Sequence, residues 1–264
     1  MYAASHDAEI FYEVTGDGPP LVLLHPFPLN HEFWKPLAPA LAERFRLVMP
    51  DLRGHGQSTA GDGPATMAKH ADDVRRMCDL AGLGRAVFAG VSIGGYVLME
   101  FWRLHRERVA GLILCDTRGG ADTEEGRANR RRAADEVERH GPLPFIESML
   151  PNLLGETTRR RRPDLVEAVR RMMLQMTVQG IVAAQTGMAA RPDSLPTLQT
   201  VDVPTLILVG AEDTLTPVAE SELMHQHMGG SRLEVIPEAG HFAPLEQPDA
   251  ALRHLHGFLE PLRW

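Results

Sequence analysis

Short, continuously apolar segments alternate with amphipathic segments along most of the chain. The apolar segments include "LVLLH", "RAVFAGVS", "VAGLILCDT" and "PTLILVGAED", and the intervening segments have helical spacing of apolar residues. Strands that are apolar on both faces are typical of a parallel sheet covered by helices on both sides. The pattern therefore predicts an α/β protein with a mostly parallel central sheet flanked by helices.

The alternation stops between residues 118 and 196. This segment has helical periodicity without a convincing strand, and it contains the arginine-rich runs "RANRRR" and "TTRRRRPDL". We predict a core domain of residues 1–117 and 197–264, with residues 118–196 inserted as a helical cap over the carboxyl edge of the sheet. The cap has 13 arginines against 11 acidic residues. Such charges are usually solvated; alternatively, one or two arginines point inward and favour an anionic substrate.

Composition restricts the partners and the location of the protein. The 264 residues carry a net charge of −8, which argues against nucleic acid as a partner. No apolar run approaches the ~20 residues of a membrane span, and no secretory signal is visible at the N-terminus. The two cysteines, Cys78 and Cys115, suit reduced structural thiols. We expect a cytoplasmic protein with a small-molecule substrate and no membrane partner; the sequence does not specify an oligomeric state.

The strongest local motif is "GVSIG", residues 90–94. Gly90, Ser92 and Gly94 fit the pattern G-x-S-x-G, directly after an apolar strand and directly before a helix. A sharp strand-to-helix turn exposes a serine hydroxyl at the sheet edge, and the two glycines let the backbone pass close on either side. The alternative is a serine that merely caps a helix. The strand and helix on either side favour Ser92 as a nucleophile.

A serine nucleophile requires a base, and the chain has 12 histidines. His241 lies in "IPEAGHFAPLEQP", after the last strand-like segment and before the last helix, which places it at the same sheet edge as Ser92. His25 and His55 also lie near this edge. His25 follows its strand immediately, however, and His55 lies in the glycine-rich segment "DLRGHGQS". We therefore predict that His241 is the base.

The base in turn needs a carboxylate that fixes its tautomer. Asp213 follows a strand in "LILVGAED", and Glu212 and Asp116 are its competitors at the same sheet edge. We rank Asp213 first. The resulting chain order of Ser92, Asp213 and His241 is nucleophile, acid, base, which is the order expected for this strand–turn–helix arrangement.

Five segments carry a resemblance to a known family: "HPFPLN", "DLRGHGQS", "GVSIGGY", "GAEDTLTP" and "GHFAPLEQP". In this order they resemble the α/β-hydrolase superfamily over essentially the whole chain, and within it the small capped carboxylesterases and enol-lactonases. "HPFPLN" also resembles the "HGFPL" loop of cofactor-free haloperoxidases and perhydrolases, although Pro26 stands where those members have glycine. The resemblance implies an α/β-hydrolase fold and hydrolysis of short to medium acyl esters or lactones, without metal or cofactor.

The same resemblance places an oxyanion hole at the backbone N–H groups of Phe27 and Ile93. Pro26 and Pro28 have no N–H, so Phe27 keeps the one donor between them. Pro28 also biases Phe27 toward an extended backbone.

Further residues are candidates for the substrate pocket, although core packing is the usual role of such side chains. They are His25, Pro28, Trp102, Met149, Leu153, Met173 and Met176. Three alternative functions remain at this point: an enol-lactonase acting on an anionic substrate, a perhydrolase or haloperoxidase that uses the same triad, and a non-catalytic ligand receptor on a hydrolase scaffold.

Overall fold

An eight-stranded sheet lies at the centre of the computed structural model, which describes residues 1–263. Its strands, in their order across the sheet, are β1 (Tyr2–Ser5), β2 (Ala8–Thr15), β4 (Arg46–Pro50), β3 (Pro20–Leu24), β5 (Ala86–Val91), β6 (Val109–Cys115), β7 (Thr205–Gly210) and β8 (Ser231–Ile236). The strands from β4 to β8 are parallel, while β1 and β2 pair antiparallel at one edge. The predicted α/β fold with a mostly parallel sheet is confirmed.

Two apolar cores lie on opposite faces of this sheet. Successive residues of β3 show why: Leu21 and Leu23 belong to one core, and Val22 and Leu24 belong to the other. The first core contains residues of the 3₁₀ helix η1 (His31–Trp34), α1 (Ala38–Ala42) and α12 (Pro248–Leu259). The second contains residues of α2 (Met67–Leu80), α3 (Ile93–His105) and α10 (Val218–His227). Both faces of the central strands are therefore covered.

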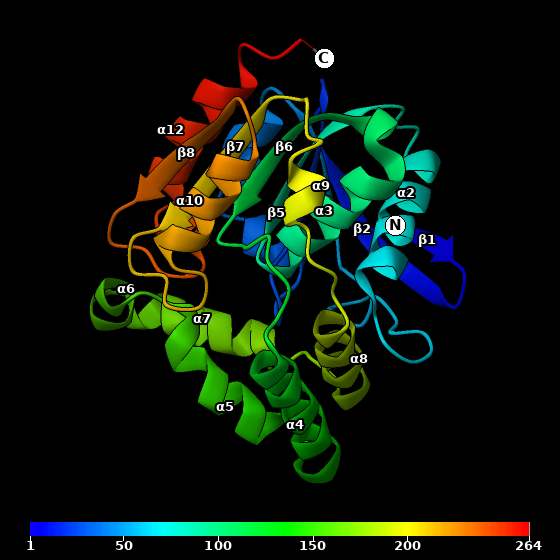
Figure 1. The fold of residues 1–264 in the computed structure, drawn as a ribbon, viewed down its shortest axis with the longest axis vertical. Helices are drawn as coiled ribbons and strands as arrows, with labels where there is room; N and C mark the ends of the chain where they lie inside the picture. Colours follow the sequence, from blue (N-terminus) through cyan, green and yellow to red (C-terminus); the bar gives the residue numbers. More distant parts are fainter. Residues whose placement is uncertain (264) are drawn as a thin grey trace.

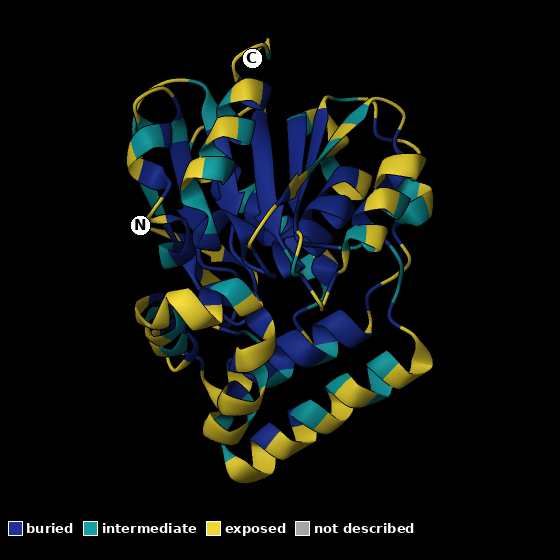
Figure 2. Ribbon diagram, turned by 90° about the vertical axis from the view of Figure 1, so that its left-hand side faces the viewer, coloured by how far each residue is buried: buried dark blue, intermediate teal, exposed yellow. Residues whose placement is uncertain are grey.

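Five helices form a layer across one end of the sheet (Figure 1). They are α4 (Glu124–His140), α5 (Pro142–Leu153), α6 (Glu156–Arg161), α7 (Pro163–Met173) and α8 (Val178–Ala189). All of them lie inside the segment 118–196 that we expect to be a cap. Figure 2 shows buried strands and long exposed faces on the outer cap helices. Short helices complete the chain: η2 (Arg106–Arg108), α9 (Leu195–Leu198) and α11 (Ala243–Glu246).

Within residues 1–263, no helix combines the length and the apolar character that crossing a membrane requires.

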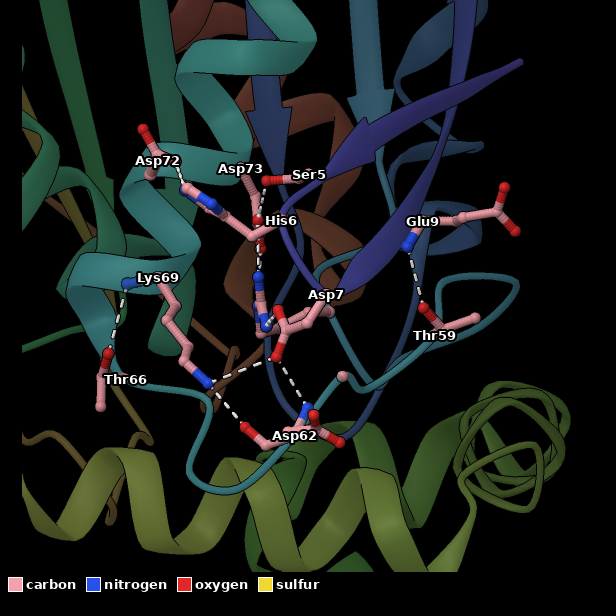
Figure 3. Close-up of polar contacts among 12 residues, drawn as sticks. Ser5, His6, Asp7, Glu9, Thr59, Asp62, Thr66, Lys69, Asp72 and Asp73 are labelled. Carbon is pink, nitrogen blue, oxygen red and sulfur yellow. Dashed lines mark hydrogen bonds and ion pairs between the residues drawn. The ribbon is translucent and has the colours of Figure 1, made fainter.

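The segment "DLRGHGQS" is fixed by a buried arginine. The guanidinium of Arg53 donates to both carboxylate oxygens of Asp73 on α2, each at 2.7 Å, and to Asp7 in the β1–β2 turn at 3.0 Å. Asp7 also accepts a hydrogen bond from the backbone N–H of Asp62 and lies 3.6 Å from the Lys69 ammonium (Figure 3). These contacts connect the N-terminal hairpin, the loop after β4 and α2.

Three buried histidines lie close together beside the loop that contains Phe27. The rings of His25 and His55 are 5.1 Å apart, and His55 also contacts Phe27 at 5.7 Å between ring centroids. Burial lowers the pKa of His25 to about 3, and it also lowers the pKa values of His55 and His70. Both ring nitrogens of His70 are buried and lack a hydrogen-bond partner within the described chain. All three rings are therefore held neutral at neutral pH.

We expect these histidines to make the fold acid-sensitive. In the unfolded chain they take up protons below about pH 6.5, whereas in the fold they remain neutral, so their contribution to stability is complete above that pH. As the pH falls below 6.5, each should lower the free energy of unfolding by up to ~1.4 kcal/mol per pH unit until its own folded-state pKa is reached, which for His25 is about 3. Urea unfolding between pH 7.5 and 5 measures this slope.

The variant His70→Met isolates one of the three contributions. It replaces a ring without hydrogen-bond partners by an apolar side chain, so the slope should decrease by up to ~1.4 kcal/mol per pH unit. His140→Gln, a substitution at an exposed position of α4, is the control. A His70→Met protein with the same slope as the wild type would contradict this explanation of acid sensitivity.

Candidate active site

Ser92 occupies the sharp turn between β5 and α3. Its φ of 55° lies in the left-handed region, where a non-glycine residue is strained. The backbone on either side fixes the turn, because the Ser92 N–H donates to the Cys115 carbonyl at 3.0 Å and the Thr117 hydroxyl donates to the Ser92 carbonyl at 2.8 Å. A Cβ on Gly90 would lie 2.5 Å from the carbonyl group of Gly94. The glycines thus let strand and helix approach closely enough to hold this conformation.

The side chains of Ser92, His241 and Asp213 form a continuous chain of contacts. Ser92 Oγ lies 2.8 Å from His241 Nε2, and His241 Nδ1 lies 2.8 Å from Asp213 Oδ2. Asp213 Oδ1 accepts from the N–H groups of Leu215 and Thr216, at 2.8 and 3.0 Å, and Oδ2 accepts from the Thr216 hydroxyl at 2.6 Å. Burial opposes ionisation of Asp213, but His241 and the Thr216 donors outweigh it and lower the pKa of Asp213.

Asp116, one of the two competitors of Asp213, has a different environment. Its two carboxylate oxygens accept from the backbone N–H groups of Gly210 on β7, at 2.8 Å, and Ala243 after His241, at 3.0 Å. It is fully buried, and burial together with the neighbouring Asp213 raises its pKa well above the usual value for an aspartate. Asp116 therefore connects the segments that carry the acid and the base without itself contacting His241.

Two glutamates connect the same loops to the cap. Glu212, the second competitor of Asp213, accepts from the N–H and the hydroxyl of Thr157 on α6, at 2.8 and 2.5 Å. Glu246, which the sequence reasoning did not single out, accepts from Gly240 beside His241 at 2.9 Å and from Gly155 in the cap at 2.8 Å. Of these four carboxylates, only that of Asp213 forms a hydrogen bond with the His241 imidazole within the described residues.

The backbone N–H groups of Phe27 and Ile93 lack an acceptor within residues 1–263. Ile93 is the first residue of α3, where helical N–H groups have no partner in the helix. Phe27 lies in a turn closed by a hydrogen bond from the Leu29 N–H to the Pro26 carbonyl, with a cis bond between Phe27 and Pro28. Phe27 lines the same cavity as Ser92, and Ile93 is the residue directly after Ser92.

Ser92 and His241 open into a cavity of about 190 Å³ between the sheet edge and the cap. The lining combines the catalytic candidates with apolar and basic side chains: Phe27, Ser92, Tyr96, Arg118, Arg130, Met149, Met188, Leu215, Thr216 and His241. The lining contains two arginines and neither aspartate nor glutamate.

Of the pocket residues expected from sequence alone, Met149 lines this cavity. Six others lie outside it: His25, Pro28, Trp102, Leu153, Met173 and Met176. Pro28 is buried in the loop before η1, and His25 accepts from the Leu52 N–H in the adjoining loop. The Trp102 indole donates to the Thr200 hydroxyl at the far end of α3. Leu153, Met173 and Met176 belong to the two apolar cores. These six side chains are therefore not among the residues that line the cavity at Ser92.

Other lining residues had no place among the sequence candidates. The position of Tyr96 near the cavity could have been predicted from the sequence, because Tyr96 follows Ser92 by four residues and therefore lies one helical turn along α3. Arg118 follows β6 closely at the active edge of the sheet. Arg130 and Met188 come from α4 and α8, and they reach the cavity only through the packing of the cap.

A second groove differs from this cavity in its chemistry. A larger groove of about 520 Å³ lies between residues 61–64 and α8, and Glu138 is its only ionisable lining residue. It therefore has no pair of nucleophile and base. In the part of the chain that the structure describes, no group of three or more His, Cys, Asp or Glu side chains is arranged to hold a metal ion.

Comparisons with known proteins identify a family and several similar proteins. A family model described as "alpha/beta hydrolase fold" matches residues 19–248. The chain is 26% identical to 3-oxoadipate enol-lactonase 1 of Acinetobacter baylyi, over 94% of this chain and 91% of the relative. A thermophilic esterase from Thermogutta terrifontis, solved with malate bound, is 42% identical with a TM-score of 0.95, over 98% of this chain and 97% of that one. An enol-lactonase from Burkholderia xenovorans is 26% identical with a TM-score of 0.92, over 98% and 100% of the two chains.

Proposed function

This chain belongs to the alpha/beta hydrolase fold family, and from that premise we propose that it cleaves carboxylic esters through Ser92, His241 and Asp213. In the coarser sense the protein is a carboxylic ester hydrolase that acts on esters or lactones, like the relatives named esterase and enol-lactonase. The observation that carries the specific proposal is the chain of two 2.8 Å contacts from Ser92 Oγ through His241 to Asp213.

The first half of the reaction forms an acyl-enzyme. The Nδ1 proton of His241 faces the Asp213 carboxylate, which leaves Nε2 free to accept the hydroxyl proton of Ser92. Ser92 Oγ attacks the ester carbonyl while Nε2 takes this proton. His241 then gives the proton to the leaving alkoxide. Asp213 stabilises the imidazolium that exists between these two transfers, and it remains ionised throughout.

The negative charge of the tetrahedral intermediate develops on the former carbonyl oxygen. The unpaired N–H groups of Phe27 and Ile93 bind this oxygen, and the N-terminus of α3 adds a favourable dipole. One such donor contributes on the order of 3 kcal/mol to transition-state stabilisation. In the second half, His241 activates a water molecule that attacks the acyl-enzyme and releases the acid and Ser92.

The small cavity leads us to expect a preference for short acyl chains. In a cavity of about 190 Å³, short acyl groups such as acetyl and butyryl should fit, whereas longer chains have to displace the cap side chains. A series of p-nitrophenyl esters from acetate to decanoate should give the highest kcat/KM at two to four carbons. A maximum at eight or more carbons would show that the cavity does not determine chain length.

Covalent labelling tests the nucleophile independently of the substrate. A fluorophosphonate probe should add one label to the folded protein at Ser92, and the variant Ser92→Ala should remain unlabelled. Absence of labelling on the folded wild-type protein would favour the alternative of a ligand receptor on a hydrolase scaffold.

A further inference from the structure

Three arginines converge on one buried carboxylate in the wall of the cavity. Arg118 Nη2 and Arg191 Nη2 donate to Asp122 Oδ1, at 2.5 and 3.3 Å, and Arg130 Nε donates to Asp122 Oδ2 at 2.5 Å. Asp122 and Arg191 are buried, whereas the side chains of Arg118 and Arg130 remain 28% and 20% exposed. Arg118 and Arg130 are the members of this cluster that reach the cavity.

The charges of this cluster do not balance. Three guanidinium groups share one carboxylate, which leaves two positive charges beside Ser92 and His241. Glu220 acts electrostatically on Arg118 from a distance, but the two side chains form no ion pair within the described chain. Like charges held together away from bulk water are unfavourable unless an opposite charge joins them. A binding site for an anion explains why the cap holds them here.

The guanidinium groups of this cluster also have more N–H donors than the surrounding described residues have strong acceptors for them. Arg118 Nε is buried and has no partner within residues 1–263. Within the described chain, Arg130 Nη1 donates to Gln185 Oε1 at 3.3 Å, which is a long hydrogen bond. It also donates to the Met188 sulfur at 3.4 Å, and a thioether is a weak acceptor. Arg118 and Arg130 therefore retain N–H donors that Asp122 does not use, and a carboxylate is a strong acceptor for such donors.

Arg191 has a different part in the cluster. Its guanidinium lies 4.0 Å from the centroid of the Tyr96 ring and donates to the carbonyls of Gly120 at 2.6 Å and Gly119 at 3.4 Å. It thereby anchors the end of the cap to the segment after β6. Arg191 positions Asp122, and Asp122 in turn holds Arg118 and Arg130 at the cavity.

We propose that Arg118 and Arg130 bind a free carboxylate of the substrate, so that the preferred substrates are short esters that also carry an acid group. This inference rests on the proposed ester hydrolysis, and it specifies the substrate class for the same cavity. The carboxylate can belong to the acyl part, as in a half-ester of a dicarboxylic acid, or to the alcohol part, as in an acylated hydroxy acid. The cavity volume of about 190 Å³ restricts both kinds to a few carbons.

Matched substrate pairs test the proposal and distinguish the two kinds. Methyl hydrogen glutarate is compared with dimethyl glutarate, and acetoxyacetate with its methyl ester, by release of methanol or acetate. The wild-type protein should prefer the anionic member of at least one pair by ten-fold or more in kcat/KM, and the preferred pair identifies the position of the carboxylate. Equal or better hydrolysis of both neutral members would overturn the proposal.

Charge-neutral variants assign the preference to the two arginines. In Arg118→Gln and Arg130→Gln, the ratio of anionic to neutral kcat/KM should fall by about 10- to 100-fold, which is the scale of one lost hydrogen bond to a charged group. Arg131→Gln is the matched control, because Arg131 is the next residue on α4 and is exposed. A ratio that is unchanged in both cavity variants, or that falls equally in the control, contradicts the assignment.

Equilibrium binding tests the anion site without catalysis and without variants. Calorimetry should show glutarate binding to the wild-type protein at least ten-fold more tightly than glutaramide, the neutral diamide of the same length. Equal affinity would refute the carboxylate site even if ester hydrolysis is observed. Tight glutarate binding by a protein that hydrolyses no ester would instead refute the proposed function and leave the anion site standing.

Discussion

Ser92→Ala should reduce kcat for ester hydrolysis by on the order of 10⁶-fold, because it removes the hydroxyl that contacts His241 Nε2 and, in the proposed mechanism, forms the acyl-enzyme. The remaining rate would come from the oxyanion donors and from binding alone. We expect the double variant Ser92→Ala/His241→Ala to be no slower than Ser92→Ala, since a base without its nucleophile has nothing to activate. Initial rates with p-nitrophenyl acetate, measured against protein-free buffer, give both values.

The matched control is Ser148→Ala, since Ser148 is an exposed cap serine whose hydroxyl donates to the Phe145 carbonyl. It should retain the wild-type rate. Circular dichroism and urea unfolding of each variant show whether the fold is intact. A folded Ser92→Ala protein that keeps more than a tenth of the wild-type kcat would exclude Ser92 as the nucleophile.

Asp213→Asn should lower kcat by about 10⁴-fold. An amide nitrogen facing His241 Nδ1 favours the tautomer with its proton on Nε2, which cannot accept the proton of Ser92. The loss should therefore appear in kcat much more than in KM. Steady-state kinetics with a short-chain ester measure both constants.

Asp116→Asn and Glu212→Gln are the comparisons that make this prediction specific. Asp116 accepts hydrogen bonds from two backbone N–H groups, so an asparagine at this position would place its NH₂ group against one of these N–H groups. This loss of a hydrogen bond should lower the free energy of unfolding by about 1–3 kcal/mol. Its effect on kcat should remain below about 100-fold. If Asp116→Asn loses as much activity as Asp213→Asn while remaining folded, Asp116 would share the role of the acid.

The parts of the fold encoded by local sequence were predictable. The apolar strands and the "GVSIG" turn depend on neighbouring residues, and the predicted sheet is confirmed by the parallel order of β4 to β8. The pairing of His241 with Asp213 follows once both stand at the carboxyl edge of that sheet. The short edge strand β1 had no comparable signal, because only its alternate residues are buried.

The wall of the cavity was less predictable, and α3 shows one reason. Trp102 follows Ser92 by ten residues, which is about 15 Å along a helix, so its position alone separates it from the cavity. Tyr96, one turn from Ser92, was the better candidate on this helix. For Arg118 and Arg130 the sequence indicated only that some cap arginines could point inward. Which ones do so depends on the buried carboxylate of Asp122 and on the packing of α4 against α8.

The two glutamates between the core and the cap have a consequence for protein engineering. Glu212, next to Asp213, accepts a hydrogen bond from Thr157. Glu246 accepts hydrogen bonds from Gly155 in the cap and from Gly240, next to His241. A cap exchanged with that of a related hydrolase is therefore not an interchangeable module. A transplanted cap that lacks N–H donors at the positions of residues 155–157 would remove the hydrogen bonds to Glu246 and Glu212. The loops that carry His241 and Asp213 would then lose their contacts with the cap at these two glutamates. Recombination points placed at the two ends of residues 118–196 would preserve the core sequence and still lose the hydrogen bonds from residues 155–157 to Glu212 and Glu246.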